Sequence, residues 1–293
     1  MLRDRLLFGP ILIALALAGA WADARLDRIP APWDPDRTLP PGVVIAPVVL
    51  LLSVMAAREL ARILREAKIQ ASTPLTIGAA ATGMLLTAFV PGHATGVSGA
   101  AMVSLAVALV LVGAMVIYGR HRRVEGMIAA AGGALMSFSL FGLMLGFLVT
   151  LRREHEVWIL LWILLSTKSG DIGAFTVGKL IGRHKLIPWL SPGKTWEGLA
   201  GGALFGAAIG SGGAALLNAA NIPGAPAALW GTGLGLLFAM LGQAGDLLAS
   251  VLKRDAGRKD SGHSLPGFGG VIDVIDSLLI VGPAAYWLLP LAS

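Results

Sequence analysis

The sequence predicts an all-α protein that crosses a membrane several times. Hydrophobic residues make up 56% of the 293 residues and charged residues only 14%, with a mean hydropathy of +0.77. This is more apolar surface than one soluble core can bury. The apolar residues fall in long runs, and a run of about 20 residues crosses a hydrocarbon core of about 30 Å as a helix. Since the Lys and Arg residues lie in short clusters between these runs, we expect a polytopic integral membrane protein.

Nine stretches are candidate transmembrane helices. They lie near residues 6–22, 43–57, 74–91, 97–118, 126–150, 157–178, 198–218, 226–249 and 271–291. The first stretch also resembles a secretory signal peptide, because Arg3 and Arg5 precede its apolar run and small residues follow it. We expect it to be an uncleaved first span. The linker 23–42 is rich in Pro and Asp and predicts an irregular external loop.

The basic clusters predict the orientation of the chain. Cytoplasmic loops carry an excess of Lys and Arg, and the loops near 92–96 and 219–225 contain neither residue. The basic clusters occupy the alternate loops, at 3–5, 58–68, 120–123, 179–194 and 253–259. The pattern places the N-terminus inside and the C-terminus outside, and it favours a topology signal over a nucleic-acid surface. Within the second cluster, Glu59 either pairs with Arg62 on the same helix or points toward a functional site.

Polar residues interrupt the apolar span 157–178. Lys168 and Asp171 are three residues apart, and charges in a membrane span are costly, so we expect them to face a wet cavity or one another. Gly170 and Gly173 favour an interrupted helix near 166–175, whose freed backbone groups would serve a ligand.

A second polar element follows this span. Residues 191–195, with the sequence Ser-Pro-Gly-Lys-Thr, are typical of a turn that enters a helix. Their hydroxyl groups, their amides and the Lys194 side chain suit an anion. The glycine spacing of a Walker A loop is missing, so the segment alone is a weak indication of nucleotide binding.

The strongest polar segment lies between residues 245 and 276. Asp246, Ser250 and Lys253 share one helical face at i, i+4 and i+7, and Asp273 and Asp276 share a face of the last span. The chain has no cysteine, which leaves oxygen atoms as the natural metal ligands. Carboxylates beside basic side chains are what a metal-assisted reaction on phosphates requires, because oxygen ligands hold Mg²⁺ and cations offset phosphate charge.

These motifs resemble the signature of the phosphatidate cytidylyltransferases, also called CDP-diacylglycerol synthases. That signature is Ser, two residues, Lys-Arg, four residues, Lys-Asp, then Pro-Gly-His-Gly-Gly and Asp-Arg-x-Asp. The chain matches it at the same spacing with Ser250, Lys253-Arg254, Lys259-Asp260, Pro266-Gly267, Gly269-Gly270, Asp273 and Asp276. The upstream family patterns, Asp-x-Gly-Ala-aromatic and Ser-Pro-x-Lys-Thr-Trp-Glu-Gly, match residues 171–175 and 191–198. Together the motifs cover about 165–280.

Two positions depart from this signature. Phe268 stands where the family has His, which removes a titratable donor, and Val274 stands where it has Arg, which removes a permanent cation. His263 lies five residues before Phe268, but nothing in the spacing requires it to replace the missing imidazole.

The resemblance implies transfer of CMP from CTP to phosphatidate, which gives CDP-diacylglycerol and pyrophosphate. It assigns catalysis to Asp246, Lys253, Arg254, Asp260 and Asp273. It assigns substrate binding to Asp171, Ser191, Lys194, Thr195, Glu197, Ser250 and Lys259. It assigns Mg²⁺ to Asp246, Asp273 and Asp276, while Asp171 and Glu197 would orient a basic partner or a second cation. On this interpretation residues 1–150 are N-terminal transmembrane helices and 151–293 form the C-terminal catalytic transmembrane region, in one continuous domain of the inner membrane with its active site facing the cytoplasm.

Other functions stay open at this point. The altered Phe268 and Val274 are compatible with a cytidylyltransferase for another lipid phosphate, or with a member that binds lipid or CTP without turnover. A secondary transporter also has charges near the midplane, but it predicts matching helix interruptions in the two halves, and the first five spans show none. The small-residue clusters 201–202 and 210–213 permit close packing within one chain or in a homodimer.

Overall fold

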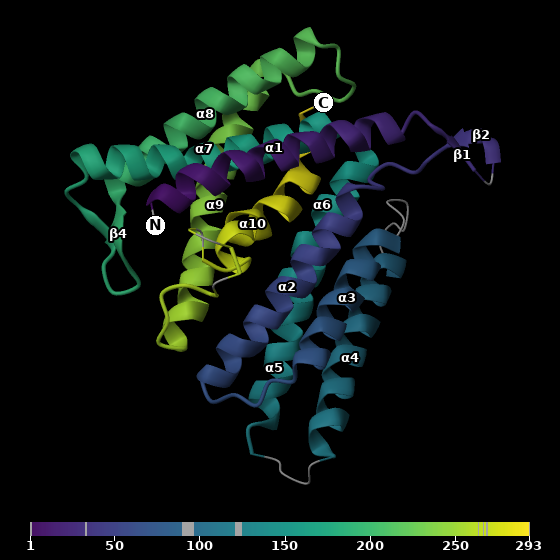
Figure 1. Cartoon of the computed structure of the whole chain (residues 1–293), viewed down its shortest axis with the longest axis vertical. Coiled ribbons are helices and arrows are strands. Elements are labelled where there is room, and N and C mark those ends of the chain that lie inside the picture. The colour runs from purple at the N-terminus through teal and green to yellow at the C-terminus, as the bar shows by residue number, and fades with distance from the viewer. Residues whose placement is uncertain are drawn as a thin grey trace.

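The structure, a computed structural model, describes residues 2–32, 34–89, 97–120, 125–262, 264–265, 267 and 269–292. It is helical apart from two short antiparallel hairpins (Figure 1). The α-helices are α1 (Leu2–Leu26), α2 (Ile45–Glu66), α3 (Thr73–Phe89), α4 (Val97–Gly119), α5 (Met127–Ser137), α6 (Leu145–Glu154), α7 (Val157–Ile181), α8 (Trp196–Ala219), α9 (Ala228–Asp255) and α10 (Ile272–Leu288). A π-helical segment, η1 (Phe138–Met144), joins α5 to α6, and a 3₁₀ turn, η2 (Leu289–Leu291), follows α10. The hairpins are β1 (Pro30–Ala31) with β2 (Asp34–Thr38), and β3 (Lys185–Ile187) with β4 (Ser191–Thr195).

The prediction of an all-α, multi-pass membrane protein is confirmed, with a correction to the count. Each of the nine predicted spans corresponds to a helix. Within the described part of the chain, seven segments are long and apolar enough to cross a membrane, and α5, η1 and α6 together form one of them. The other two are not among these seven: the described part of α3 is 17 residues long, and the second half of α2 carries Arg58, Glu59, Arg62, Arg65 and Glu66.

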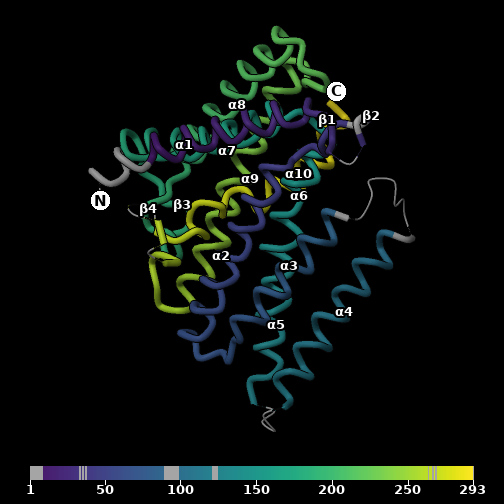
Figure 2. The backbone as a smooth tube through the Cα atoms, turned by 45° about the vertical axis from the view of Figure 1, so that its right-hand side comes forward, coloured from purple at the N-terminus to yellow at the C-terminus, as the bar shows by residue number. Residues whose placement is uncertain are grey.

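The helices form two groups that cross at a steep angle. Figures 1 and 2 show α1, α7 and α8 lying together across one side, while α2, α3, α4 and α5 run in another direction. Helices α7, α8 and α9 pack against one another, and α10 packs between α9 and α6. Large fully buried side chains such as Phe141, Leu60 and Phe238 fill the shared core. The site described below lies among α7, α8, α9, α10 and the β3–β4 hairpin.

The predicted interruption near 166–175 is wrong, because α7 runs as a continuous helix from Val157 to Ile181. The two glycines serve close packing. A Cβ on Gly170 would lie 2.6 Å from Ala239 Cβ of α9, and one on Gly173 would lie 2.6 Å from Phe205 Cγ of α8. Both positions therefore lack a side chain so that neighbouring helices can approach, which is the usual role of small residues in membrane helices.

The irregular helix lies in the first half of the chain instead. The span predicted at 126–150 contains η1, where the α-helical hydrogen-bond pattern gives way to a π-helix. Helix α3 crosses this segment at close range: a Cβ on Gly83 would lie 2.7 Å from Phe138 O and 2.8 Å from Gly142 Cα. This backbone contact fixes the position of α3 against η1.

The linker 23–42 is more ordered than an irregular loop. Helix α1 extends to Leu26, and β1 and β2 form a hairpin after it. Asp23 is fully buried and accepts hydrogen bonds from Val44 N (2.8 Å) and Ile45 N (3.2 Å) at the start of α2. Arg152 of α6 pairs with Asp23 at 2.5 Å and also pairs with Asp27. The end of the first span is thus tied to α2 and α6.

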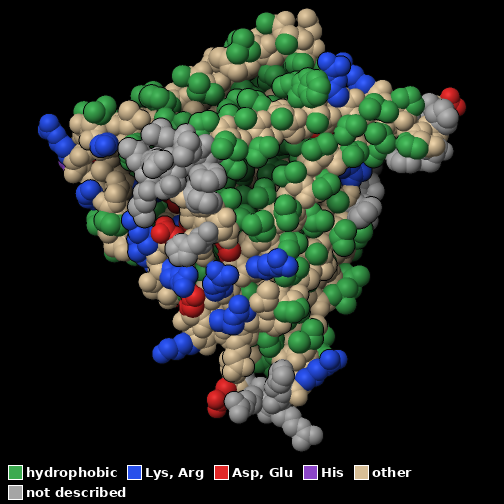
Figure 3. All heavy atoms as spheres, in the orientation of Figure 1, with side chains coloured by type: hydrophobic (Ala, Val, Ile, Leu, Met, Phe, Trp, Pro, Cys, Tyr) green, Lys and Arg blue, Asp and Glu red, His purple; other side chains and the backbone are tan. Residues whose placement is uncertain are grey.

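The basic clusters gather on one side of the molecule. Figure 3 shows Lys and Arg side chains concentrated along its lower-left side. Helices α2, α7 and α9 end there, as a comparison with Figure 1 shows. This arrangement agrees with alternate loops on a common side, and the assignment of that side to the cytoplasm stays a prediction.

Candidate active site

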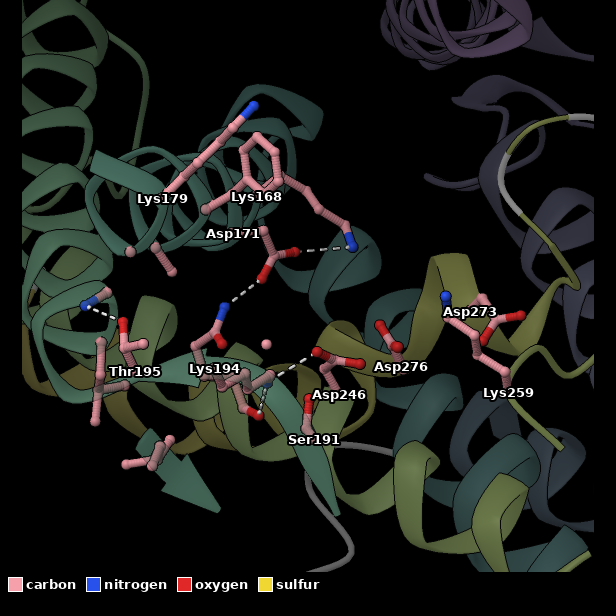
Figure 4. A pocket seen from close by; sticks show the side chains of 18 residues that line it. Lys168, Asp171, Lys179, Ser191, Lys194, Thr195, Asp246, Lys259, Asp273 and Asp276 are labelled. Carbon is pink, nitrogen blue, oxygen red and sulfur yellow. Dashed lines mark hydrogen bonds and ion pairs between the residues drawn. The ribbon is translucent and has the colours of Figure 1, made fainter. Parts of the chain in front are cut away.

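A polar pocket of about 710 Å³ is lined by the C-terminal halves of α7 and α9 and the first turns of α10, beside the β3–β4 hairpin. Its volume lies within the range of small-molecule sites, about 300–1,000 Å³. Figure 4 shows the charged side chains that line it. They are Lys168, Asp171, Lys179, Lys194, Asp246, Lys259, Asp273 and Asp276. Polar segments more than 100 residues apart in sequence therefore meet in one place.

Lys168 and Asp171 of α7 both face one another and line the pocket, as the sequence predicts. Lys168 Nζ lies 3.4 Å from Asp171 Oδ2 and donates to Ser277 Oγ of α10 at 2.5 Å. Gln243 of α9 donates to Asp171 Oδ1 at 2.8 Å. Side chains of three helices thus meet around this carboxylate.

Residues 191–195 form strand β4 rather than a turn, and α8 begins directly after it. Thr195 caps the helix, because its Oγ1 accepts a hydrogen bond from Gly198 N at 3.1 Å. Lys194 reaches across the pocket to α9, where its Nζ lies 2.8 Å from Asp246 Oδ2 and 3.1 Å from Gln243 O. Ser191 also lines the pocket. The hairpin therefore supplies a lysine and hydroxyl groups to one wall.

Glu197, predicted to contact substrate, does not line the pocket. Its carboxylate accepts hydrogen bonds from Arg183 N (3.1 Å) and His184 N (3.2 Å), and His184 Nδ1 lies 2.5 Å from it. These contacts join the start of the hairpin to the first turn of α8. Glu197 therefore holds the hairpin that carries Lys194.

Asp273 is fully engaged with protein groups. Its Oδ1 accepts from Lys253 Nζ at 2.5 Å. Its Oδ2 accepts from Ser261 N and Gly270 N, each at 2.9 Å, and Ser261 Oγ lies at the same distance. Among the described residues, no three acidic or histidine side chains are grouped closely enough to hold a metal ion. The predicted triad of Asp246, Asp273 and Asp276 therefore does not form a ready-made metal site.

Asp246 and Asp276 are placed differently from Asp273. Figure 4 shows both carboxylates at the centre of the pocket, and Asp273 and Lys259 toward its right-hand end. Asp246 lies near enough to Asp276 and to Asp171 to interact electrostatically with both carboxylates. Asp246 pairs with Lys194 through Oδ2 and Asp276 accepts from Ser277 N through Oδ1, so each has a second oxygen available to a ligand in the pocket.

The remaining predicted residues lie around the pocket rather than in it. Lys253 is buried and holds Asp273. Arg254 is exposed and donates to Arg258 O at 3.4 Å, where α9 ends. Asp260 is exposed and Ser250 is half-buried, and neither lines the pocket. Of the predicted face of α9, Asp246 alone reaches the cavity directly.

Comparison with known proteins identifies the family of the chain. The model of the cytidylyltransferase family matches residues 38–292. The chain belongs to the cytidylyltransferase family. The match includes every polar segment that lines the pocket.

Several known proteins have similar sequences. The phosphatidate cytidylyltransferase of Bacillus subtilis (strain 168) is 42% identical over 125 residues, which is 43% of this chain and 45% of the relative. The phosphatidate cytidylyltransferase of Mycobacterium tuberculosis (strain H37Rv) is 35% identical over 154 residues, 53% of this chain and 44% of the relative. The uncharacterized protein YnbB of Escherichia coli (strain K12) is 40% identical over 144 residues, 48% of this chain and 45% of the relative. The chain thus spans about half the length of the curated relatives it matches.

The two departures from the cytidylyltransferase signature, Phe268 and Val274, lie just before α10 and in its first turn. Pro266, Phe268 and His263 are outside the described residues. Val274 is half-buried in the first turn of α10, between Asp273 and Asp276. Val274 does not itself line the pocket, so the arginine of the signature is missing next to Asp273 in sequence rather than from the pocket wall.

Two residues of the site, Gln243 and Ser277, are not predicted from the sequence, and they bind Asp171 and Lys168. For Glu59 the structure decides between the two predicted roles, because it contacts the segment that contains the partners of Asp273 and not Arg62. A signal existed for Gln243, because it is a polar residue within an apolar span one turn before Asp246. Ser277 has no comparable signal, since a serine in a membrane helix commonly bonds its own backbone.

Proposed function

We propose that the chain transfers CMP from CTP to phosphatidate, giving CDP-diacylglycerol and pyrophosphate. The observation that carries this proposal is the pocket itself. It combines the carboxylates of Asp171, Asp246 and Asp276 with the ammonium groups of Lys168 and Lys194 at the ends of membrane helices. A nucleotide and a lipid headgroup can meet only at such a boundary. The names of the relatives from Bacillus subtilis and Mycobacterium tuberculosis support the same reaction.

The reaction is a displacement at phosphorus. An oxygen of the phosphatidate phosphate forms a bond to the α-phosphorus of CTP, and the bond from that phosphorus to the bridging oxygen of the β-phosphate breaks. Pyrophosphate leaves with the bonding electrons. The second pKa of a phosphate monoester is about 6, so the lipid phosphate is mostly dianionic at neutral pH and needs no strong base. The protein's task is then positioning and charge compensation.

The pocket residues suit this task. Lys194, held in place by Asp246, and Lys259 are the cations that we assign to the nucleotide phosphates. Lys168 sits deeper along α7, next to Ser277, and we assign it to the lipid phosphate. The hydroxyl groups of Ser191 and Thr195 line the same wall. Lys253 acts on the site through Asp273.

The pocket carboxylates also suit a Mg²⁺ ion that is bound to the phosphates of the nucleotide. Mg²⁺ is commonly bound by one or two carboxylates plus substrate phosphates and water, so a closed set of three protein ligands is unnecessary. Asp246 and Asp276 are the residues that would hold the ion, because Asp273 is engaged by Lys253, Ser261 and Gly270. The bound ion would neutralise charge on the phosphates.

The location follows from the same reasoning. The chain is a multi-pass membrane protein, and we propose that it lies in the inner membrane with the pocket facing the cytoplasm. The basic clusters support this orientation, since they gather on the side where the pocket opens. CTP would then enter from the cytosol and phosphatidate from the adjacent leaflet.

The test is an assay with the purified full chain, CTP, Mg²⁺ and phosphatidate. We expect CDP-diacylglycerol from the wild type and at least a 100-fold lower rate from Asp246→Asn. The matched control is Glu66→Gln, which alters an acidic residue outside the pocket and should keep the wild-type rate. Product from Phe268→His, Val274→Arg but none from the wild type would show that the natural chain has lost turnover.

The substitution of Val274 favours one alternative, a different lipid phosphate. Without the signature arginine, the first turn of α10 has one less cation than the family signature next to Asp273. A panel containing phosphatidate, ether-linked phosphatidate and a polyprenyl phosphate separates the two proposals by the substrate with the highest kcat/KM. Binding of CTP without product from any lipid in the panel would indicate a non-catalytic member.

A further inference from the structure

Glu59 connects the first half of the chain to the site. It lies on α2, and its side chain is 3% exposed. It does not pair with Arg62, which is exposed. Its carboxylate instead faces the segment 261–272, about 200 residues later in the sequence. This is the segment that leads from α9 into Asp273.

Both carboxylate oxygens of Glu59 are saturated by this segment. Oε1 accepts from Ser264 Oγ at 2.7 Å and from Val271 N at 2.9 Å. Oε2 accepts from Ile272 N at 3.0 Å, and Ser261 Oγ lies 2.9 Å away. Val271 and Ile272 begin α10, so the buried negative charge of Glu59 also lies at the positive end of a helix dipole.

The same segment supplies the partners of Asp273. Ser261 Oγ lies 2.9 Å from Glu59 Oε2 and from Asp273 Oδ2, so its single hydroxyl hydrogen can bond to either carboxylate. Ser261 N and Gly270 N donate to Asp273. Asp273 in turn binds Lys253. One chain of contacts therefore runs from α2 through the segment to α9.

Glycines allow the backbone to close around Glu59. A Cβ on Gly270 would collide with Ser261 Oγ and with the Glu59 carboxylate, and one on Gly262 would lie 3.0 Å from Glu59 Oε1. Gly269 has a φ of +96°, a conformation that favours glycine. The segment is thus shaped to wrap a carboxylate at this position.

We propose that Glu59 is a positioning residue for the cytidylyltransferase site. It fixes the described residues of segment 261–272, and through them the placement of Asp273 at the pocket and of Lys253, which holds Asp273 from α9. Glutamine has the same shape, but its amide nitrogen cannot accept a hydrogen bond. In Glu59→Gln the amide NH₂ therefore replaces one carboxylate oxygen, and the two donors that bonded to that oxygen lose their acceptor. A displacement of about 1 Å at an active site lowers the rate roughly 100-fold.

The experiment compares the wild type, Glu59→Gln and Glu66→Gln in the full chain. Glu66 is the matched control, because it lies on the same helix and pairs with Arg258 of the same connection, but at the surface. Hydrogen exchange of the 261–273 amides is measured alongside kcat and KM. In Glu59→Gln we expect at least tenfold faster exchange of the Val271 and Ile272 amides. We also expect kcat to fall at least tenfold, with each KM within about threefold of the wild-type value. Glu66→Gln should leave both readouts within about twofold.

Ser264→Ala provides a milder variant should Glu59→Gln fail to fold. It removes one donor and leaves the carboxylate, and we expect smaller changes in the same direction. Because the role rests on the proposed function, the exchange readout separates the two: it tests the contact even if no CDP-diacylglycerol forms. Wild-type exchange in the variants, or faster exchange with an unchanged kcat in an active chain, would overturn the proposal.

Discussion

Lys194 of strand β4 and Asp246 of helix α9 form an ion pair of 2.8 Å across the pocket, 52 residues apart in sequence. The pair joins the hairpin to the polar end of α9. It also presents a cation next to a carboxylate at the place where phosphates and Mg²⁺ would bind. Its partial exposure means that it contributes little to stability, about 1 kcal/mol or less. We therefore expect the Lys194–Asp246 pair to contribute to catalysis rather than to the stability of the fold.

Lys194→Met tests that separation of roles. Methionine keeps the length of the side chain but removes the charge that offsets the phosphates. We expect kcat/KM for CTP to fall at least 100-fold, while the thermal unfolding midpoint changes by only a few degrees. Steady-state kinetics and a melting curve in the same detergent check both points. An equally large loss in Lys179→Met, at the edge of the pocket, would argue against a special role for Lys194.

Asp276→Asn tests the assignment of the metal ligands. Asparagine keeps the size of the side chain but binds Mg²⁺ more weakly. We expect the Mg²⁺ concentration for half-maximal rate to rise at least tenfold in Asp276→Asn and in Asp246→Asn. Asp273→Asn should lower the rate without shifting that concentration, because Asp273 binds Lys253, Ser261 and Gly270. A similar shift in all three variants would restore the triad that the sequence suggests.

The buried pair between Asp23 and Arg152 predicts a change in stability rather than in chemistry. Removing one partner of a buried ion pair costs about 3–5 kcal/mol when the other charge is left uncompensated. In Asp23→Asn, Arg152 keeps Asp27 as a partner, so we expect a smaller loss that still lowers the unfolding midpoint. The double variant Asp23→Leu, Arg152→Met should recover part of the loss. Thermal unfolding of the two variants decides this, and a midpoint for Asp23→Asn equal to that of the wild type would contradict the account.

Gly170 predicts a packing effect. A Cβ at this position would lie 2.6 Å from Ala239 Cβ, so Gly170→Ala forces α7 away from α9. We expect a loss of about 1–3 kcal/mol in the free energy of unfolding. Gly233→Ala in α9 is the matched control, because no atom lies within 4 Å of the added Cβ. The control should be neutral or slightly stabilising. Equal effects of the two substitutions would exclude packing as the reason.

The sequence predicts the parts of this site that depend on local spacing. Asp171 lies one turn from Lys168, and Asp246 stands one turn before Ser250, so helical periodicity alone places them. The spans are predictable for the same reason, since about 20 apolar residues cross a bilayer whatever their neighbours are.

Long-range pairing is what the sequence does not reveal. Glu59 meets Val271 across 212 residues, and no local pattern relates the two. Asp273 has a signature spacing typical of a metal ligand, yet its oxygens are used by Lys253 and by the segment before it. Gly170 and Gly173 are compatible with a broken helix or with close packing, and only the positions of Ala239 and Phe205 decide for packing.

The most direct measurement determines which phosphate of labelled CTP enters the lipid product. The full chain is incubated with Mg²⁺, phosphatidate and CTP labelled at the α-phosphate or, separately, at the γ-phosphate, and the lipids are extracted. Transfer of CMP predicts that the α-label enters the lipid as CDP-diacylglycerol and that the γ-label is released as pyrophosphate. Appearance of the γ-label in the lipid, or of neither label under conditions where a Bacillus subtilis phosphatidate cytidylyltransferase is active, would contradict the account.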